Sequence, residues 1–227
     1  MQNIRVIVAD TETSGLNKED GPCEVAWVEI DEDMNVIDRV HSLIDPQVPI
    51  KASASGIHSI TDRIVAEAPT LDEFFDEVLG NPFQNDQIVF VAHNAPFDWK
   101  FFKKYIPNHL GTICTLRLAR HIFPDEENHK LQTLRYSLGL EDGEGGGAHT
   151  AMGDVEVCLN LLRAAVNKDG GTLMEMMEIS ETPITVKTMP FGKHKGTKLG
   201  ALPTQYVQWL LGLDNIDDDL RGSLEQL

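Results

Sequence analysis

The chain has 227 residues, of which 41% are hydrophobic, and this is enough for one α/β domain with a small appendage. Its net charge of −17 argues against a protein that holds nucleic acid by bulk electrostatics, and leaves either another partner or local recognition helped by bound cations. No apolar run reaches the roughly 18–20 residues that span a bilayer, and the N-terminus lacks a signal-peptide layout. We therefore expect a cytoplasmic protein with no membrane partner.

Three strands are predicted at the start of the chain. Residues 4–9 form the apolar run of a buried strand that ends at Asp10, and residues 23–30 and 35–44 follow as the second and third strands. Trp27, on the second strand, is expected in the core. Because the turns between these strands are short and polar, the pattern indicates an antiparallel meander.

The middle of the chain mixes helices with one more strand. Residues 87–94 are apolar enough to form a strand that is buried on both faces. A helix is expected from residue 95, with Asn94 as its cap and Pro96 in its first turn. Other helices are expected at residues 52–68, at 70–80 with Thr70 as N-cap, and at 113–123, 130–140, 150–168 and 172–180. This order predicts a mixed β-sheet flanked by helices.

The composition changes near residue 180, and we expect a main domain at residues 1–180 and a small appendage at residues 181–227. The appendage carries four lysines with no acidic residue between Pro183 and Pro203, and an acidic stretch follows. The three cysteines are scattered and form no CxxC pair, so neither a disulfide framework nor a zinc site is expected.

Two carboxylates stand at the end of the first strand. Asp10 and Glu12 are two residues apart, so on a strand they share one face. Two adjacent carboxylates repel unless a proton or cation lies between them, and such a pair suits an oxygen-preferring metal. The alternative is a polar strand end in which Thr11 and Thr13 make a turn.

Two further acidic residues stand at the starts of predicted helices. Asp98 follows the fourth strand, and Asp154 opens the helix at residues 150–168. Each by itself is explained by the favourable interaction of an acidic side chain with the helix macrodipole. His149 precedes Asp154 by five residues and follows a glycine run; a lone loop histidine of this kind is usually solvated and idle.

Together the motifs DTETSGL, HNAPFD and HTAMGD, with SGIHSIT between the first two, resemble the DEDDh 3′–5′ exonucleases of the ribonuclease H-like superfold. The resemblance covers roughly residues 4–166. It implies an α/β fold with a ribonuclease H-like mixed β-sheet flanked by helices. The tail PFGKHKGTKLGALPTQYVQWLL resembles the FGKxxG segment that follows the nuclease domain in the exodeoxyribonuclease X group.

Carried over by position, the resemblance implies that Asp10, Glu12, Asp98 and Asp154 hold two Mg²⁺ ions, with Mn²⁺ as a substitute, and that His149 is the general base. Asp10 would bridge the ions, Glu12 and Asp154 would serve the ion that carries the attacking water, and Asp98 would serve the other. Histidine suits a base because its ordinary pKa of about 6.5 lies near working pH. The glycines at 145–147 would let His149 move when substrate enters.

Residues near these motifs are expected to bind substrate. Leu16 resembles the family's apolar residue that packs against the terminal base, although ordinary loop packing also explains it. Phe97 would stack on a base, with a place in the core as the alternative. The full expected set is Thr11, Thr13, Leu16, His93, Asn94 and Phe97. His58, in the SGIHSIT segment, is expected to be structural.

The appendage has three possible roles. Lys193, Lys195 and Lys198, with Phe191, Tyr206 and Trp209 nearby, would form a patch that contacts DNA phosphates. The alternatives are contact with another protein, or a packed appendage whose helix docks on the nuclease.

The resemblance implies an Mg²⁺-dependent 3′–5′ exodeoxyribonuclease that releases nucleoside monophosphates from DNA 3′ ends, in single strands or frayed duplexes, with a role in DNA repair. Three alternatives remain: an RNA exonuclease of the same fold, a proofreading subunit that edits for a DNA polymerase, and a non-catalytic nucleic-acid-binding module. The exodeoxyribonuclease X-like tail favours DNA and argues against the proofreading role. The presence of all five expected catalytic residues argues against a non-catalytic module.

Overall fold

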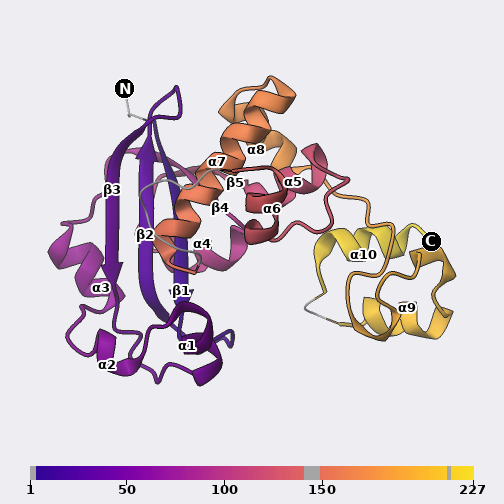
Figure 1. Ribbon diagram of the computed structural model, residues 1–227, viewed down its shortest axis with the longest axis horizontal. Coiled ribbons are helices and arrows are strands. Elements are labelled where there is room, and N and C mark those ends of the chain that lie inside the picture. Colours follow the sequence, from indigo (N-terminus) through magenta and orange to yellow (C-terminus); the bar gives the residue numbers. More distant parts are fainter. Residues whose placement is uncertain (1–3, 141–148, 214–215) are drawn as a thin grey trace. The chain divides into compact units, whose positions relative to one another are not determined.

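The computed structural model describes residues 4–140, 149–213 and 216–227 (Figure 1). The chain divides into two compact units, Met1–Ser180 and Glu181–Leu227. None of the helices in the described ranges combines the length and apolar character that crossing a bilayer requires.

The first unit is built on one five-stranded sheet with the strand order β3-β2-β1-β4-β5. β1 pairs antiparallel with β2 and β2 antiparallel with β3, so the predicted meander is confirmed. β1 and β4 pair in parallel, as do β4 and β5. The strands are β1 (Ile4–Thr13), β2 (Pro22–Ile30), β3 (Val36–Leu43), β4 (Gln87–Ala92) and β5 (His109–Cys114).

Helices flank this sheet, as the sequence predicts. In the first unit they are α1 (Ala52–His58), α2 (Asp62–Val65), α3 (Leu71–Glu73), the π-helix η1 (Phe74–Val78), α4 (Pro96–Phe102), α5 (Thr115–Ile122), α6 (Leu131–Ser137), α7 (Ala151–Asp169) and α8 (Leu173–Glu181). In the second unit they are the 3₁₀ turns η2 (Gly192–His194) and η3 (Leu199–Ala201), and the helices α9 (Thr204–Leu211) and α10 (Asp218–Glu225).

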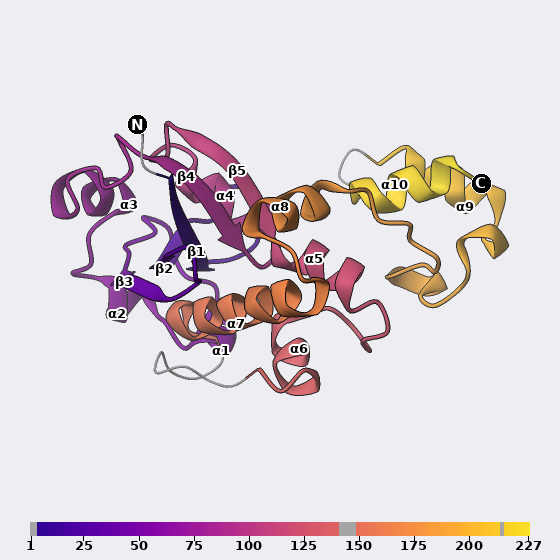
Figure 2. The same cartoon turned by 90° about the horizontal axis from the view of Figure 1, so that it is seen from above.

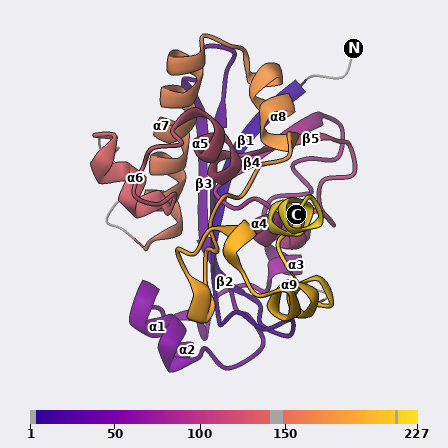
Figure 3. The ribbon, with the colours of Figure 1, turned by 90° about the vertical axis from the view of Figure 1, so that its right-hand side faces the viewer.

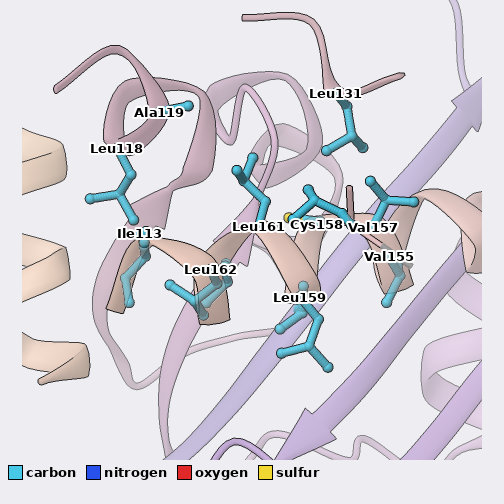
Figure 4. Packing of buried hydrophobic residues seen from close by; sticks show 14 of the residues in the cluster. Ile113, Leu118, Ala119, Leu131, Val155, Val157, Cys158, Leu159, Leu161 and Leu162 are labelled. Atoms are coloured by element: carbon cyan, nitrogen blue, oxygen red, sulfur yellow. The ribbon is translucent and has the colours of Figure 1, made fainter. Parts of the chain in front are cut away.

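The two faces of the sheet bury different clusters, because successive side chains on a strand point to opposite faces. Val8 and Ala26 belong to a cluster with the apolar face of α7 (Figure 4). Ile7 and Trp27 belong to the opposite cluster, in which Trp27 is 2% exposed and stacks on Phe75. α6 and α7 lie on one side of the sheet and α3 and α4 on the other (Figures 2 and 3). The predicted core position of Trp27 is confirmed.

Two predicted elements are wrong in their type or length. Residues 113–123 are predicted as one helix, but β5 (His109–Cys114) ends within that range and α5 begins only at Thr115. Pairing with β4 decides this, because Ile113 and Cys114 lie beside Val91 and Ala92 and complete the sheet. The single helix expected at residues 52–68 is instead α1 and α2, separated at Ser59, which has a left-handed backbone with φ +64°.

Two predicted helix caps have opposite outcomes. The Thr70 hydroxyl accepts a hydrogen bond from the Glu73 N–H, and the Glu73 carboxylate accepts one from the Thr70 N–H, so this cap is confirmed as a reciprocal capping box. Asn94 is not the cap of α4, because Ala95 holds that position without a side-chain bond and Asn94 has φ +66°. Pro96 is the first residue of α4, as expected.

Candidate active site

β1 presents its carboxylates beyond the end of its parallel neighbour. The β1–β4 pairing runs from Ile4 to Val8, whereas β1 continues to Thr13. Alternation places Asp10 and Glu12 on the face of Val8, which packs in the cluster of α7. The strand is therefore longer than the sequence predicts, and both carboxylates share the face that α7 covers.

Asp98 reaches the same strand from the first turn of α4. Its side chain is 2% exposed, and its Oδ1 accepts hydrogen bonds from the Thr11 N–H at 3.0 Å and from the Thr11 hydroxyl at 2.7 Å. The Thr11 N–H lies beyond the last β1–β4 pair, so the carboxylate takes the place of a strand partner. These bonds hold Asp98 against β1 at Thr11, the residue between Asp10 and Glu12 in the chain.

α7 brings the fourth carboxylate to β1. The Thr150 hydroxyl caps the helix by accepting from the Gly153 N–H at 3.2 Å, and Asp154 lies in the first turn. Asp154 also accepts a hydrogen bond from the Gln132 amide at 2.5 Å and one from the backbone N–H of His149. Gln132 is thus a residue that the sequence analysis missed, and it orients Asp154.

His149 stands at the edge of this group. It is exposed and has a left-handed backbone with φ +64°. A nitrogen of its ring and carboxylate oxygens of Glu12 and Asp154 lie within 4.8 Å of one another. The structure therefore brings together three of the predicted site residues that come from β1 and from the start of α7. The glycines at 145–147, which are expected to let His149 move, lie outside the described residues.

Burial raises the pKa of all four carboxylates, and repulsion between their charges adds to this for Asp10 and Glu12. Burial raises the pKa of Asp10 well above its ordinary value, and the charges of Asp98, Asp154 and Glu12 add to this. The pKa of Glu12 is raised to about 8, mainly by burial and next by the charge of Asp154. Burial raises the pKa of Asp98 to about 7, although its hydrogen bonds from Thr11 act in the other direction. Burial also raises the pKa of Asp154. Such a group needs protons or cations to neutralise it.

A pH dependence of stability follows. A carboxylate whose pKa is higher in the folded than in the unfolded state stabilises the fold below its unfolded pKa, and this stabilisation is lost as pH rises through the folded pKa. The pH range over which this stabilisation is lost begins at the ordinary carboxylate pKa. It ends at about pH 8 for Glu12 and at about pH 7 for Asp98. We expect the melting temperature of metal-free protein to fall between about pH 5 and 8, and to fall less in Glu12→Gln.

Thermal unfolding in EDTA at a series of pH values measures this effect. Mg²⁺ or Mn²⁺ should raise the melting temperature more at pH 8 than at pH 6, because a cation then replaces protons that are already lost. A melting temperature that responds to metal equally at both pH values would contradict the assigned cluster.

Glu24 is a fifth carboxylate that the sequence analysis missed. It lies directly across from Glu12 in the β1–β2 register and is buried. Its Oε2 accepts a hydrogen bond from the Ala151 N–H at 2.8 Å, and its Oε1 lies 2.7 Å from Nε2 of His41. Glu24 therefore ties the start of α7 to β2. An acidic residue on the otherwise apolar face of residues 24–30 was the available signal.

The segment after β1 presents Leu16 to solvent. Ser14 N–H donates to the Gly21 carbonyl at 2.9 Å, and the Asp20 carboxylate accepts from the Asn17 N–H at 2.7 Å. A Cβ on Gly15 would lie 2.4 Å from the Asp20 carboxylate, so any other residue there would have to displace the Asp20 side chain. Leu16 is 84% exposed at this tightly built loop, so the loop leaves most of its side chain uncovered.

His58 fixes the same end of β1 from α1. Its Nδ1 accepts from the Ile60 N–H at 3.1 Å, which assigns the proton to Nε2. Nε2 lies 3.2 Å from the Thr13 carbonyl, to which it donates. The expected structural place of His58 agrees with these bonds.

The other residues that are expected to bind substrate differ in their exposure and in whether their polar atoms are free to bind a ligand. Both ring nitrogens of His93 are engaged, Nδ1 with the Thr115 hydroxyl and Nε2 with the His129 carbonyl, each at 3.0 Å, so neither is available to a substrate. Asn94 is exposed, and Phe97 is half-buried with the Lys100 ammonium 4.0 Å from its ring centre. Thr11 and Thr13 are buried, and the Thr13 hydroxyl donates to the Gly15 carbonyl at 2.8 Å.

Comparisons with known proteins agree with this arrangement. The family model described as "Exonuclease" matches residues 7–162, and one described as "Putative quorum-sensing-regulated virulence factor" matches residues 178–213. The chain is 31% identical to Exodeoxyribonuclease 10 of Escherichia coli strain K12 over 225 residues, which cover 96% of each chain.

Two solved structures share the fold. The structure of exonuclease X in complex with 5′ overhanging duplex DNA matches with a TM-score of 0.62 and 29% identity, over 78% of this chain and 99% of that one. The nuclease domain of 3′hExo, a DEDDh family member bound to rAMP, matches with a TM-score of 0.60 over 73% of this chain and 92% of that one, and at 14% identity it shows the fold alone. The chain therefore belongs to the DEDDh exonuclease family, and it is a 3′–5′ exonuclease with a ribonuclease H-like fold.

Proposed function

We infer that the chain hydrolyses phosphodiester bonds at the 3′ ends of DNA and releases nucleoside monophosphates by a two-metal mechanism with a histidine base. The observation that carries this proposal is the convergence of four carboxylates with raised pKa values beside one exposed histidine. Structural ion-pair networks also shift pKa values, but no ion pair among the described residues joins a lysine or arginine to one of these four carboxylates.

The donor set fits hard divalent cations. Asp10, Glu12, Asp98 and Asp154 offer only carboxylate oxygens, which Mg²⁺ prefers and which Mn²⁺ also accepts. Their raised pKa values mean that cations would take the place of protons. Two such ions lower the pKa of a water and stabilise charge on the leaving oxygen. We assign His149 to the base role rather than to the metal, because its nitrogen is a poor ligand for Mg²⁺.

The residues of the chain supply the rest of the reaction. His149, at the exposed edge of the site, would accept the proton of the attacking water at a ring nitrogen. The bond from its backbone to Asp154 keeps it close to α7. Thr11 fixes Asp98, and Glu24 holds the start of α7, so the reacting groups rest on packed elements rather than on loops alone.

The substrate is proposed to be DNA because the relative that matches over nearly the whole chain is named an exodeoxyribonuclease. Exposed Leu16 and half-buried Phe97 would pack on the terminal bases of a single strand or a frayed duplex. Such packing is tolerant of sequence, which suits an end-trimming enzyme in DNA repair. An RNA exonuclease of this fold is the second candidate.

A time course with 3′- and 5′-labelled oligonucleotides tests the proposal. Single-stranded DNA, duplex DNA and a matched RNA are incubated with Mg²⁺ or with EDTA. We expect stepwise shortening from the 3′ end that requires Mg²⁺ and is faster on DNA. Faster degradation of RNA than of DNA would mean that the chain is an exoribonuclease instead. No degradation by folded, metal-loaded protein would contradict it.

A further inference from the structure

The second unit exposes aromatic side chains that its own packing does not use. Trp209 is 54% exposed and Phe191 44% exposed. The centre of the Tyr206 ring lies 5.3 Å from that of Trp209, with 31° between the ring planes, and 4.5 Å from that of His194. We call these three rings and Lys193, together with the exposed Phe191, Lys195 and Lys198 of the adjoining residues 188–198, the aromatic–lysine face.

The core of this unit explains why Trp209 is left outside. Met189, Leu199, Leu210, Leu220 and Leu224 form a buried cluster within residues 181–227. Helical periodicity in α9 directs Leu210 into that cluster, and its neighbour Trp209 points elsewhere. Trp209 thus lies outside the buried cluster with about half of its side chain exposed, and together with exposed Phe191 it offers apolar surface of the kind that marks interaction sites.

A tight hairpin builds the lysine part of the face. Thr188 pairs with Lys198, and the segment between them includes Gly192 at φ +69° and Gly196 at φ +81°. A Cβ on Gly192 would lie 3.3 Å from the Tyr206 hydroxyl, so glycine lets the hairpin approach α9 closely. As a result the Lys193 ammonium lies 5.5 Å from the centre of the Tyr206 ring.

The lysines of this face are available to an anionic ligand. No acidic residue occurs between Pro183 and Pro203, in a chain whose net charge is −17. Within residues 4–140, 149–213 and 216–227, no carboxylate lies within ion-pairing distance of Lys193, Lys195 or Lys198, and all three are exposed. The face is therefore a local exception to the acidity of the protein.

We propose that the aromatic–lysine face binds single-stranded DNA. Flat aromatic rings stack on bases, and nearby ammonium groups follow the phosphates, which is how proteins hold single strands without sequence preference. A duplex would contact the lysines but would leave its bases stacked away from Trp209. The choice of DNA rests on the proposed function. Because both units belong to one chain, a strand held here remains at high local concentration for the nuclease unit.

The test is binding of a fluorescently labelled single-stranded oligonucleotide by the full chain in EDTA, so that no strand is cut. Trp209→Ala should weaken binding about five- to a hundredfold, the range for loss of one stacked base. Lys193→Ala should lower the slope of log affinity against log salt by about 0.7. Trp209→Phe keeps a ring and should retain most of the affinity. Lys103→Ala, an exposed lysine of the nuclease unit, is the matched control and should bind as the parent does.

A second measurement separates this proposal from the proposed function. An aryl ester of thymidine monophosphate offers the nuclease site one nucleotide and carries no further strand for Trp209 to hold, so Trp209→Ala should hydrolyse it at the parent rate. If the parent hydrolyses neither this ester nor DNA while Trp209→Ala still weakens binding, the proposed function fails and the aromatic–lysine face stands. If Trp209→Ala and Lys193→Ala both bind single strands as tightly as the parent, the face does not bind DNA, and a protein partner becomes the occupant to seek.

Discussion

Replacement of Asp10 by asparagine is expected to lower the rate of DNA cleavage at least about a thousandfold and to raise the melting temperature of the metal-free protein. Charge stabilisation by bound metal contributes several kcal/mol, and about 4 kcal/mol corresponds to this loss. The stability gain has the same origin as the activity, because burial and four neighbouring carboxylates disfavour a charged Asp10. A rise of at least about 2 °C at pH 8 would correspond to about 1 kcal/mol in a chain of this size.

Initial rates on 3′-labelled DNA and thermal unfolding in EDTA measure the two effects on the same preparation. Asp38→Asn is the matched control, because Asp38 is an exposed aspartate on β3 and its replacement should change neither quantity. Loss of cleavage together with a lower melting temperature would mean that Asp10 supports the fold rather than a metal. Cleavage at the parent rate would remove Asp10 from the site altogether.

Replacement of His149 by alanine is expected to lower the cleavage rate by about 10²–10⁴-fold, the usual contribution of a positioned general base. Binding of metal should remain, because the four carboxylates are unchanged. Added imidazole should restore part of the rate, since a small base can enter a site whose histidine was exposed. Single-turnover rates with and without imidazole, and the rise in melting temperature with Mn²⁺, give the three readouts.

His109→Ala is the control for this variant. His109 begins β5, at the opposite end of the parallel strands from Asp10, so its loss should not change the cleavage rate. A different outcome is possible for His149 itself, because its ring nitrogen, Glu12 and Asp154 lie within 4.8 Å of one another. If His149→Ala loses the thermal response to Mn²⁺ and imidazole does not rescue it, His149 is a metal ligand and the base assignment is wrong.

Part of this protein was predictable from local sequence. Alternation along residues 23–30 predicted which side chains of β2 share a face, and Trp27 lies in the core, as expected. Thr70 was recognisable as a cap because its hydroxyl can satisfy the free N–H groups of the first helical turn. The strand period also predicted that Asp10 and Glu12 share a face, since this needs only the geometry of one strand.

Other features depended on contacts between distant segments. Ile113 and Cys114 belong to a segment with a helical sequence pattern. They nevertheless end β5, because there they complete the sheet beside β4. His93 lies in a motif that suggested substrate contact. Both of its ring nitrogens are nevertheless hydrogen-bonded within the protein, one to the Thr115 hydroxyl and one to the His129 carbonyl. Glu24 showed no motif, although its bond to the Ala151 N–H anchors α7.

The sequence by itself determined the strand faces, one reciprocal cap and the motifs that indicate the family, because each depends on neighbouring residues and a fixed backbone period. Only the tertiary structure decided that Asp98 replaces a missing strand partner at Thr11, and that burial, with the nearby charge of Asp154, raises the pKa of Glu12 to about 8. Hydrogen bonding, burial and charge repulsion across a site depend on distances between segments that lie far apart in the chain, and a linear pattern does not contain those distances.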